Sequence, residues 1–234
     1  MNSLAEAFAQ ALGLVATADP KLVDIVLLSL RISLSAVVLG CLIGLPVGAA
    51  VAVNEFRGKR TLTVTLNALM GLPSVVVGLV VYLLLSRAGP LGALGILFTP
   101  PAMVIAQTIL ITPTIAALSR QMVADAWQEY REQLRSLGET RLGAGTTLLW
   151  DLRFSLVTIV LAGFGRAASE VGAVMIVGGN IDGVTRVMTT SIALETSKGD
   201  LPLALGLGII LLSIVLALNA GAYVVKETAQ RRYG

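Results

Sequence analysis

The sequence contains no histidine, a single cysteine and few aromatic residues, and each shortage excludes a class of function. Without histidine, zinc sites of the HExxH type, Ser-His-Asp triads and Cys-His dyads are all excluded. The single cysteine, Cys41, excludes an internal disulfide and a metal site built from several thiolates. Aromatic residues make up 5% of the chain and no basic repeat accompanies the net charge of +3, so we expect no nucleic-acid partner.

Charged residues are also scarce. They make up 13% of the 234 residues, whereas 56% are hydrophobic, and a soluble domain carries roughly 25% charged residues. A compact soluble protein of this length cannot keep so much apolar surface away from water. The composition therefore predicts an all-α membrane protein whose solvent is the lipid bilayer.

The chain also lacks a nucleotide-binding loop. The nearest approach to a Walker A motif, Gly58-Lys59-Arg60, has neither the upstream glycine nor the Ser/Thr that the motif requires. We therefore expect no catalytic residues, no metal site and no cofactor bound by this chain itself.

Long charge-free runs indicate how often the chain crosses the membrane. A crossing helix needs about 20 apolar residues, and five stretches satisfy this requirement. They are predicted at residues 24–53, 61–86, 101–122, 154–178 and 201–225. Two arginines, Arg31 and Arg166, lie inside these spans. Two prolines, Pro73 and Pro113, lie inside the second and third spans and are expected to kink them.

The lysines and arginines between the spans predict the orientation. Eleven lie on the side that holds residues 120–153 and the C-terminus, and four lie on the other side. Because cytoplasmic loops carry the excess of positive charge, the C-terminus is predicted to be cytoplasmic and the N-terminus external. Residues 1–20 lack a basic start and are not expected to be a cleavable signal peptide. Their apolar residues at helical spacing favour an external amphipathic helix, with a frayed tail as the alternative.

The only long polar segment, residues 120–153, is predicted to be a cytoplasmic loop. It reads as a helix to about Leu137, a break at Gly138 and a second short helix, since glycine supplies the left-handed conformation that ends a helix. Apolar residues between its charges suit either docking of a partner protein or capping of the helical bundle.

This loop resembles the coupling loop of ABC importer permeases. The run Glu132-Gln-Leu-Arg-Ser-Leu-Gly138 has that family's spacing of glutamate and glycine, and Leu148 occupies its later hydrophobic position. The sequence departs from the family pattern at Gln133 and Leu134, where two alanines are usual, and at Asp151, where proline is usual. Three further motifs extend the likeness to about residues 22–226: the first resembles the second-span signature of molybdate/tungstate-type permeases, and the other two resemble the tungstate branch of the molybdate/tungstate/sulfate permeases. They are Gly71-Leu-Pro-Ser-Val-Val-Val-Gly78, residues 165–180 and residues 189–200.

The resemblance implies one transmembrane permease domain of the type I ABC importer fold, in the inner membrane of a prokaryote. Two copies of the chain would frame one pathway, with two ATPase subunits that bind ATP and Mg beneath it and an external solute-binding protein that delivers the oxyanion. The residues implied to couple this subunit to the ATPase are Glu132, Arg135, Gly138, Glu139, Arg141 and Leu142.

Two intramembrane charges are candidates for the translocation pathway. Arg166 and Glu170 are four residues apart, which places them on one face of a continuous helix. Because a charge in the membrane usually faces the bundle interior, Arg166 is expected either to attract a dianionic oxyanion, with Glu170 holding it in place, or to form a structural ion pair with Glu170.

The glycine-rich outer segment that ends in Thr189, Thr190 and Ser191 is a second candidate, because its hydroxyls and backbone amides suit an anion path. Met188 and Ile192 are expected to form an apolar constriction there, and a short helix is expected over residues 189–198. A solvated connecting loop is the alternative for this segment.

The function predicted from all these features is the membrane subunit of an ATP-driven tungstate importer. Molybdate or sulfate import by the same architecture is the first alternative. A membrane-embedded enzyme is a more remote alternative, because the spans carry too few titratable groups for catalysis. An ATP-independent anion channel is also more remote, because the long loop would have no purpose in it.

Overall fold

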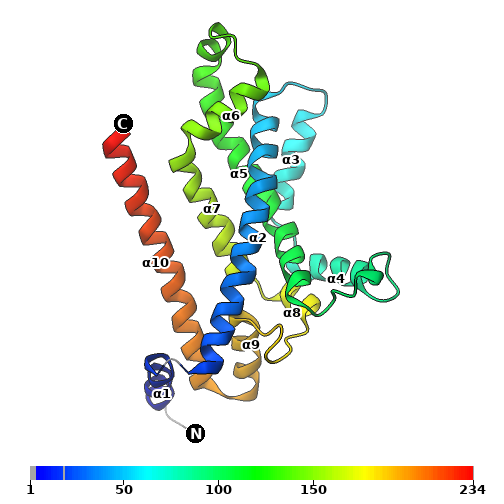
Figure 1. The fold of residues 1–234 in the computed structure, drawn as a ribbon, viewed down its shortest axis with the longest axis vertical. Coiled ribbons are helices and arrows are strands. Elements are labelled where there is room, and N and C mark those ends of the chain that lie inside the picture. Colours follow the sequence, from blue (N-terminus) through cyan, green and yellow to red (C-terminus); the bar gives the residue numbers. More distant parts are fainter. Residues whose placement is uncertain (1–3, 18, 234) are drawn as a thin grey trace. The chain divides into compact units, whose positions relative to one another are not determined.

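The computed structural model describes residues 4–17 and 19–233, and in this part of the chain all regular structure is helical (Figure 1). Residues 1–3, Ala18 and Gly234, which belong to the predicted external segment and to the end of the predicted domain, lie outside the described residues. The elements are α1 (Leu4–Ala16), α2 (Pro20–Val53), α3 (Lys59–Leu69), α4 (Ser74–Leu85), the 3₁₀ turn η1 (Gly92–Leu94), α5 (Pro100–Ser136), α6 (Arg141–Asp151), α7 (Arg153–Ala168), α8 (Gly172–Gly178), α9 (Met188–Lys198) and α10 (Leu201–Tyr233).

Three described helices are long and apolar enough to cross a membrane by themselves, namely α2, α5 and the Leu201–Gly221 part of α10. The pairs α3 with α4 and α6 with α7 each provide one further crossing if the broken pair is taken as one span, which gives up to five. The predicted all-α membrane fold is confirmed, and the predicted number of crossings, five, equals this upper number. The broken pair α6 with α7 differs, however, from the predicted fourth span, 154–178, which leaves out α6 and combines α7 with α8.

The second and fourth predicted spans are not continuous helices. α3 ends at Leu69, and Pro73 stands in extended backbone immediately before α4. Proline suits this place because it lacks the N–H that a helix interior needs, so Pro73 separates two helices where a kink was expected. The fourth span is divided between α7 and α8. Pro113, by contrast, lies inside α5, which continues past it.

The chain forms two compact units, each built from segments far apart in the sequence. Unit 1 comprises the residues up to Ser35, Pro73–Gln107 and Ala167–Leu218, and unit 2 comprises Ala36–Leu72, Thr108–Arg166 and the residues from Asn219. The long helices α2, α5 and α10 contribute to both units.

Unit 2 is organised by close contact between α2 and α5. Gly40, Gly44 and Gly48 lie one turn apart on α2 and face Ile111, Ile115 and Ser119 of α5. The Ser119 hydroxyl donates a hydrogen bond of 3.3 Å to the Gly44 carbonyl. Small residues at this spacing let two helix backbones approach, which is how helices associate where lipid supplies no hydrophobic driving force.

Unit 1 has its own apolar core, formed by Leu22, Ile25, Met188 and Leu207. In the same unit α4 packs against α8, where Gly78 leaves room for the backbone of Ala173. The expected N-terminal helix is present as α1. Its Ala7 and Ala11 are buried while Phe8 and Leu12 are exposed, and its binding to a membrane surface stays a prediction.

Candidate functional site

The turn between α5 and α6 has a well-defined backbone geometry, and this turn together with its two arms (residues 132–151) is here called the elbow. α5 ends at Ser136, and Gly138 follows with a φ of +78°. The Gly138 N–H donates to the Arg135 carbonyl (3.0 Å) and the Glu139 N–H donates to the Leu134 carbonyl (3.1 Å). These two bonds and a left-handed glycine are the Schellman ending of a helix. The predicted break at Gly138 is therefore confirmed.

The second arm of the elbow begins at once. Thr140 caps α6, its hydroxyl accepting a hydrogen bond of 3.1 Å from the Gly143 N–H, and such a cap stabilises a short helix by about 1 kcal/mol. α6 then meets α7 at an angle of 80°. The helix predicted after the break is confirmed and runs over Arg141–Asp151.

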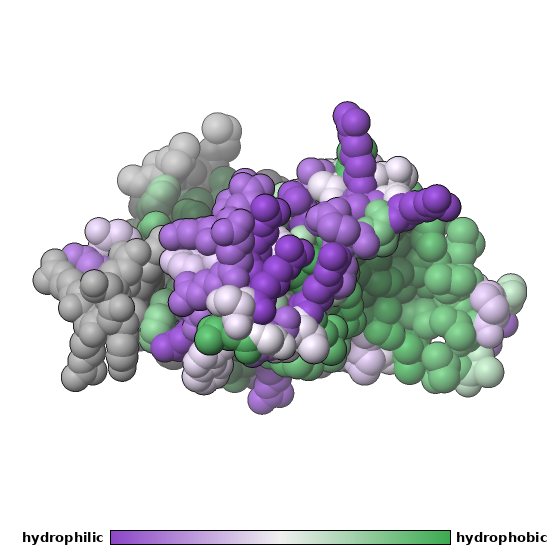
Figure 2. All heavy atoms as spheres, turned by 90° about the horizontal axis from the view of Figure 1, so that it is seen from above, coloured by the Kyte–Doolittle hydropathy of each residue, from purple (hydrophilic) through white to green (hydrophobic). Residues whose placement is uncertain are grey.

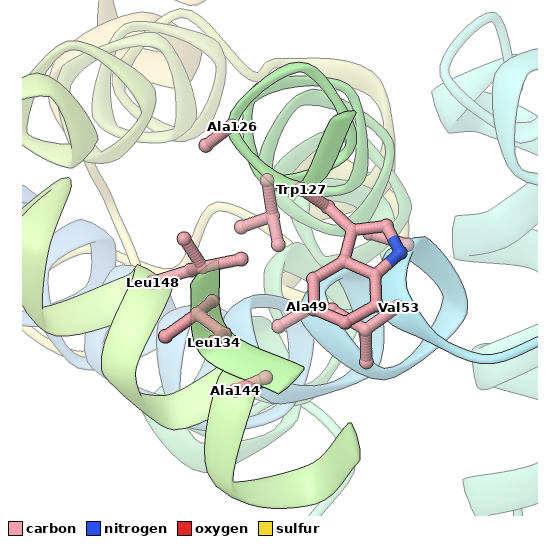
Figure 3. Packing of buried hydrophobic residues seen from close by; sticks show 9 residues of the cluster. Ala49, Val53, Ala126, Trp127, Leu134, Ala144 and Leu148 are labelled. Atoms are coloured by element: carbon pink, nitrogen blue, oxygen red, sulfur yellow. The ribbon is translucent and has the colours of Figure 1, made fainter. Parts of the chain in front are cut away.

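One face of the elbow packs against the rest of unit 2 through apolar side chains (Figure 3). Leu134 of α5 and Ala144 and Leu148 of α6 are buried together with Trp127 and Val53. Leu148 is the residue at the family's hydrophobic position, and only 2% of its surface is exposed. This packing joins α6 to α2 and α5, so that a force applied to α6 is carried into unit 2.

The other face of the elbow is open. Leu137, Leu142 and Trp150 are each about 70% exposed, with 72%, 74% and 68% of their surfaces accessible. Figure 2 views the protein from the side on which α6 lies and shows mainly hydrophilic side chains gathered there. Large exposed apolar side chains within a polar surface are typical of a protein docking site.

The residues implied to couple this chain to an ATPase all lie in the elbow. Each of them is exposed, and the Arg135 guanidinium also lies 5.9 Å from the centre of the Trp127 ring. They are Glu132, Arg135, Gly138, Glu139, Arg141 and Leu142.

The α2–α3 connection adds charge beside the elbow. Lys59 forms a 2.9 Å ion pair with Glu55 and also donates to the Ala52 carbonyl at the end of α2. The hydrogen bond and charge of Lys59 lower the pKa of the Glu55 carboxyl, and the charge of Arg141 adds to this effect. Glu55 is thus ionised at neutral pH, and its negative charge interacts electrostatically with Arg141 of α6.

Gly138→Ala is expected to destabilise the purified protein by about 1 kcal/mol, because a left-handed residue with a side chain is strained. A Cβ at Gly138 meets no atom within 4 Å, so the loss comes from the backbone alone. Gly165→Ala in α7 is the matched control, since its Cβ is equally unobstructed and its φ is helical. It should be neutral or stabilising by up to about 1 kcal/mol. Thermal unfolding in detergent measures both variants, and equal melting temperatures would contradict the strain.

Arg166 and Glu170 do not share a helix face, because α7 ends at Ala168 and Glu170 lies in the break before α8. The prediction that these two residues share one face of a continuous helix is therefore wrong. The Arg166 guanidinium donates 3.3 Å to the Leu72 carbonyl, which the break after α3 leaves outside any helix. The Glu170 carboxylate accepts 2.9 Å from the Ala173 N–H, where a negative charge at the start of α8 is favourable. Both side chains hold helix breaks in their own units.

The outer candidates Met188, Thr189, Thr190 and Ser191 lie in the first turn of α9 and are buried in unit 1, and Ile192 is partly buried against the core of that unit. Met188 packs in the unit's core. The Thr189 hydroxyl donates 2.7 Å to the Glu170 carbonyl, and the Thr190 hydroxyl accepts 3.2 Å from the Val187 N–H. Only the hydroxyl of Ser191 has no hydrogen-bond partner among the described residues. Through these contacts Met188, Thr189 and Thr190 stabilise the segment. Ser191 is the outer candidate that still has unused hydrogen-bonding capacity.

Sequence reasoning assigned no role to Arg31 and Arg186, which line the same pocket of unit 1 as Ser191. Arg31 carried a signal that was not used, namely an arginine within an otherwise apolar span. Arg186 carried none, because a basic residue in a polar segment is unremarkable until its neighbours are known. For metal binding, the described residues contain no group of three or more potential ligands.

Comparison with known proteins places these features in context. Residues 36–233 match the family described as binding-protein-dependent transport system inner membrane component. The chain is 42% identical to the tungstate uptake system permease protein of Peptoclostridium acidaminophilum, over 97% of this chain and 100% of that one. It is 35% identical to the protein of the same name from Campylobacter jejuni, over 97% and 95%. It is 44% identical to a probable anion ABC transporter permease protein of Haloferax volcanii, over 85% and 88%. Sulfate transport permeases are more distant.

Proposed function

Because this chain belongs to the family of inner membrane components of binding-protein-dependent transport systems, we propose that it is the membrane-spanning subunit of an ATP-driven tungstate importer. The observation that carries the proposal is the 42% identity to a tungstate uptake permease across the full length of that protein. Likeness of this extent includes the spans as well as the loop, so it favours the same cargo as well as the same architecture.

We further propose that two copies of the chain form one pathway above two ATPase subunits, and that an external binding protein delivers the anion. The excess of lysine and arginine beside α6 supports a cytoplasmic elbow and C-terminus and an external N-terminus. ATP and Mg²⁺ would then be held by the ATPase. This chain would bind neither.

The elbow supplies the mechanical link in this proposal. Leu137, Leu142 and Trp150 offer apolar anchors for a groove on the ATPase, while Glu132 and Arg141 set the register of docking more than its affinity. Leu148 and its neighbours on the opposite face transmit the movement into α2 and α5. Transport driven by rigid-body motion requires such a stiff connection, and the Schellman turn with the Thr140 cap provides it.

Reconstitution tests the proposal directly. The chain is inserted into liposomes with its ATPase, and tungstate-loaded binding protein is added on the outer side. We expect tungstate uptake that requires ATP and exceeds uptake of molybdate or sulfate offered on the same binding protein. A complex whose ATPase subunit cannot hydrolyse ATP serves as the control.

Two outcomes would contradict the proposal. Uptake of molybdate or sulfate in preference to tungstate would contradict the assigned cargo but not the proposed importer architecture. Equal anion flux without ATP would show a channel, and the importer assignment would be wrong.

A further inference from the structure

Unit 1 contains a broad polar pocket of about 820 Å³, here called the α2–α9 pocket. Its walls come from the beginning of α2, from the turn that precedes α9, and from α9 with the start of α10. Eight charged side chains line it, four of each sign. They are Lys21, Asp24, Arg31, Asp182, Arg186, Glu195, Lys198 and Asp200.

The carboxylates of this pocket are mostly engaged by the protein itself. Asp182 accepts a 2.9 Å ion-paired hydrogen bond from Arg186, and the buried Glu195 accepts one of 3.0 Å from Lys198. Asp200 caps α10 by accepting 3.3 Å from the Leu203 N–H. Of the four acids, only Asp24 has no such contact among the described residues.

The cations of the pocket retain unused capacity. Neither Lys21 nor Arg31 forms an ion pair within residues 4–17 and 19–233. The Nε–H of Arg186 is buried and has no acceptor there, although its Nη1 is bound to Asp182. The pocket therefore presents two guanidinium groups, Arg31 and Arg186, with N–H donors to spare.

Ser191 adds a neutral donor to the same wall. Its side chain is fully buried and its Oγ has no hydrogen-bond partner among the described residues, whereas Thr189 and Thr190 beside it are both bonded. A buried hydroxyl without a partner costs free energy, and a ligand in the pocket would remove that cost. The unused groups are hydrogen-bond donors, and the two arginines among them are cationic, so they suit an anion.

We propose that the α2–α9 pocket is a transit site for a tetrahedral oxyanion, bound by the guanidinium groups of Arg31 and Arg186 and the hydroxyl of Ser191. The planar fork of arginine matches the paired oxygens of such an anion. The neighbouring carboxylates keep the binding weak, which transport requires because the ion must leave again. This inference rests on the proposed import of an oxyanion and identifies where the ion pauses.

The test uses the complete transporter in liposomes with tungstate-loaded binding protein at saturating concentration. Arg31→Gln should lower the rate of tungstate uptake about tenfold, the loss of one charge-assisted hydrogen bond, while stimulated ATP hydrolysis stays within about twofold, so that fewer anions move for each ATP. Ser191→Ala should lower uptake without lowering the melting temperature, because it removes a hydroxyl that has no partner in the protein. Arg31→Lys should recover part of the rate.

Arg87→Gln is the matched control, since Arg87 is an exposed arginine of unit 1 that does not line the pocket. If Arg31→Gln and Ser191→Ala transport like this control in a complex that imports tungstate, the pocket is not a transit site although the importer is real. A titration of the binding protein completes the test: if Arg31→Gln leaves the saturated rate unchanged and raises only the concentration of binding protein that is needed, the pocket contacts that protein, which overturns the inference. A wild-type complex that moves no tungstate, molybdate or sulfate overturns both proposals.

Discussion

Gly48→Ala is expected to prevent the C-terminal half of α2 from packing against α5, so that a single methyl group causes a large loss of stability. A Cβ at Gly48 would lie 2.5 Å from the Ala116 carbonyl oxygen and 2.8 Å from the Arg120 amide nitrogen, both backbone atoms of α5, and it would also overlap the Ser119 hydroxyl. Backbone atoms cannot rotate away, so the two helices must separate. Overpacking of this kind costs about 3 kcal/mol or more.

The prediction is checked by expression, gel filtration in detergent and thermal unfolding of the purified variant. Gly40→Ala is the control on the same face of the same helix, because its Cβ would meet only the flexible side chains of Ile111 and Ile115, at 3.0 Å or more. We expect Gly40→Ala to fold with a modest loss of stability, and Gly48→Ala to be poorly folded. Equal behaviour of the two variants would show that α2 and α5 do not depend on this close contact.

If the proposed importer assignment is correct, Leu142→Asp is expected to weaken binding of the proposed ATPase partner without damaging the fold. Leu142 is 74% exposed at the start of α6, so the isolated chain loses almost no buried surface. At a docking interface, however, an exposed leucine that fills a partner's pocket contributes about 2 kcal/mol or more, and a carboxylate there is left desolvated. Binding of the ATPase should therefore weaken about 30-fold, as expected from 2 kcal/mol.

Two measurements follow this change: retention of the ATPase during purification, and stimulation of ATP hydrolysis by the loaded binding protein. Gln128→Asp is the control, because it adds the same charge at an exposed position of α5 outside the elbow. Normal stimulation in Leu142→Asp would mean that α6 does not form the contact with the ATPase. Loss of stimulation in both variants would point to the added charge itself.

Much of this protein follows from its sequence without any coordinates. The shortage of charge and the long apolar runs dictate a helical membrane protein, because only a helix satisfies its backbone hydrogen bonds within one segment of a bilayer. The elbow was also visible in advance. Gly138 can end α5 at no steric cost, and the polar sequence with scattered apolar residues on either side predicts a helix up to about Leu137 and a second, short helix after the break. These are local properties, decided by residues within a few positions of one another.

The tertiary structure decided the features that depend on distant residues. The four-residue spacing of Arg166 and Glu170 in the sequence suggests an ion pair only if the helix is continuous. In the folded chain this helix ends at Ala168. The intolerance of Gly48 arises from backbone atoms of α5, which no local pattern reveals. Arg31 and Ser191 lie in different helices, and only the fold of unit 1 brings them to one pocket. Helical periodicity specifies which face a residue occupies, whereas the element that covers this face is chosen by packing along the whole chain.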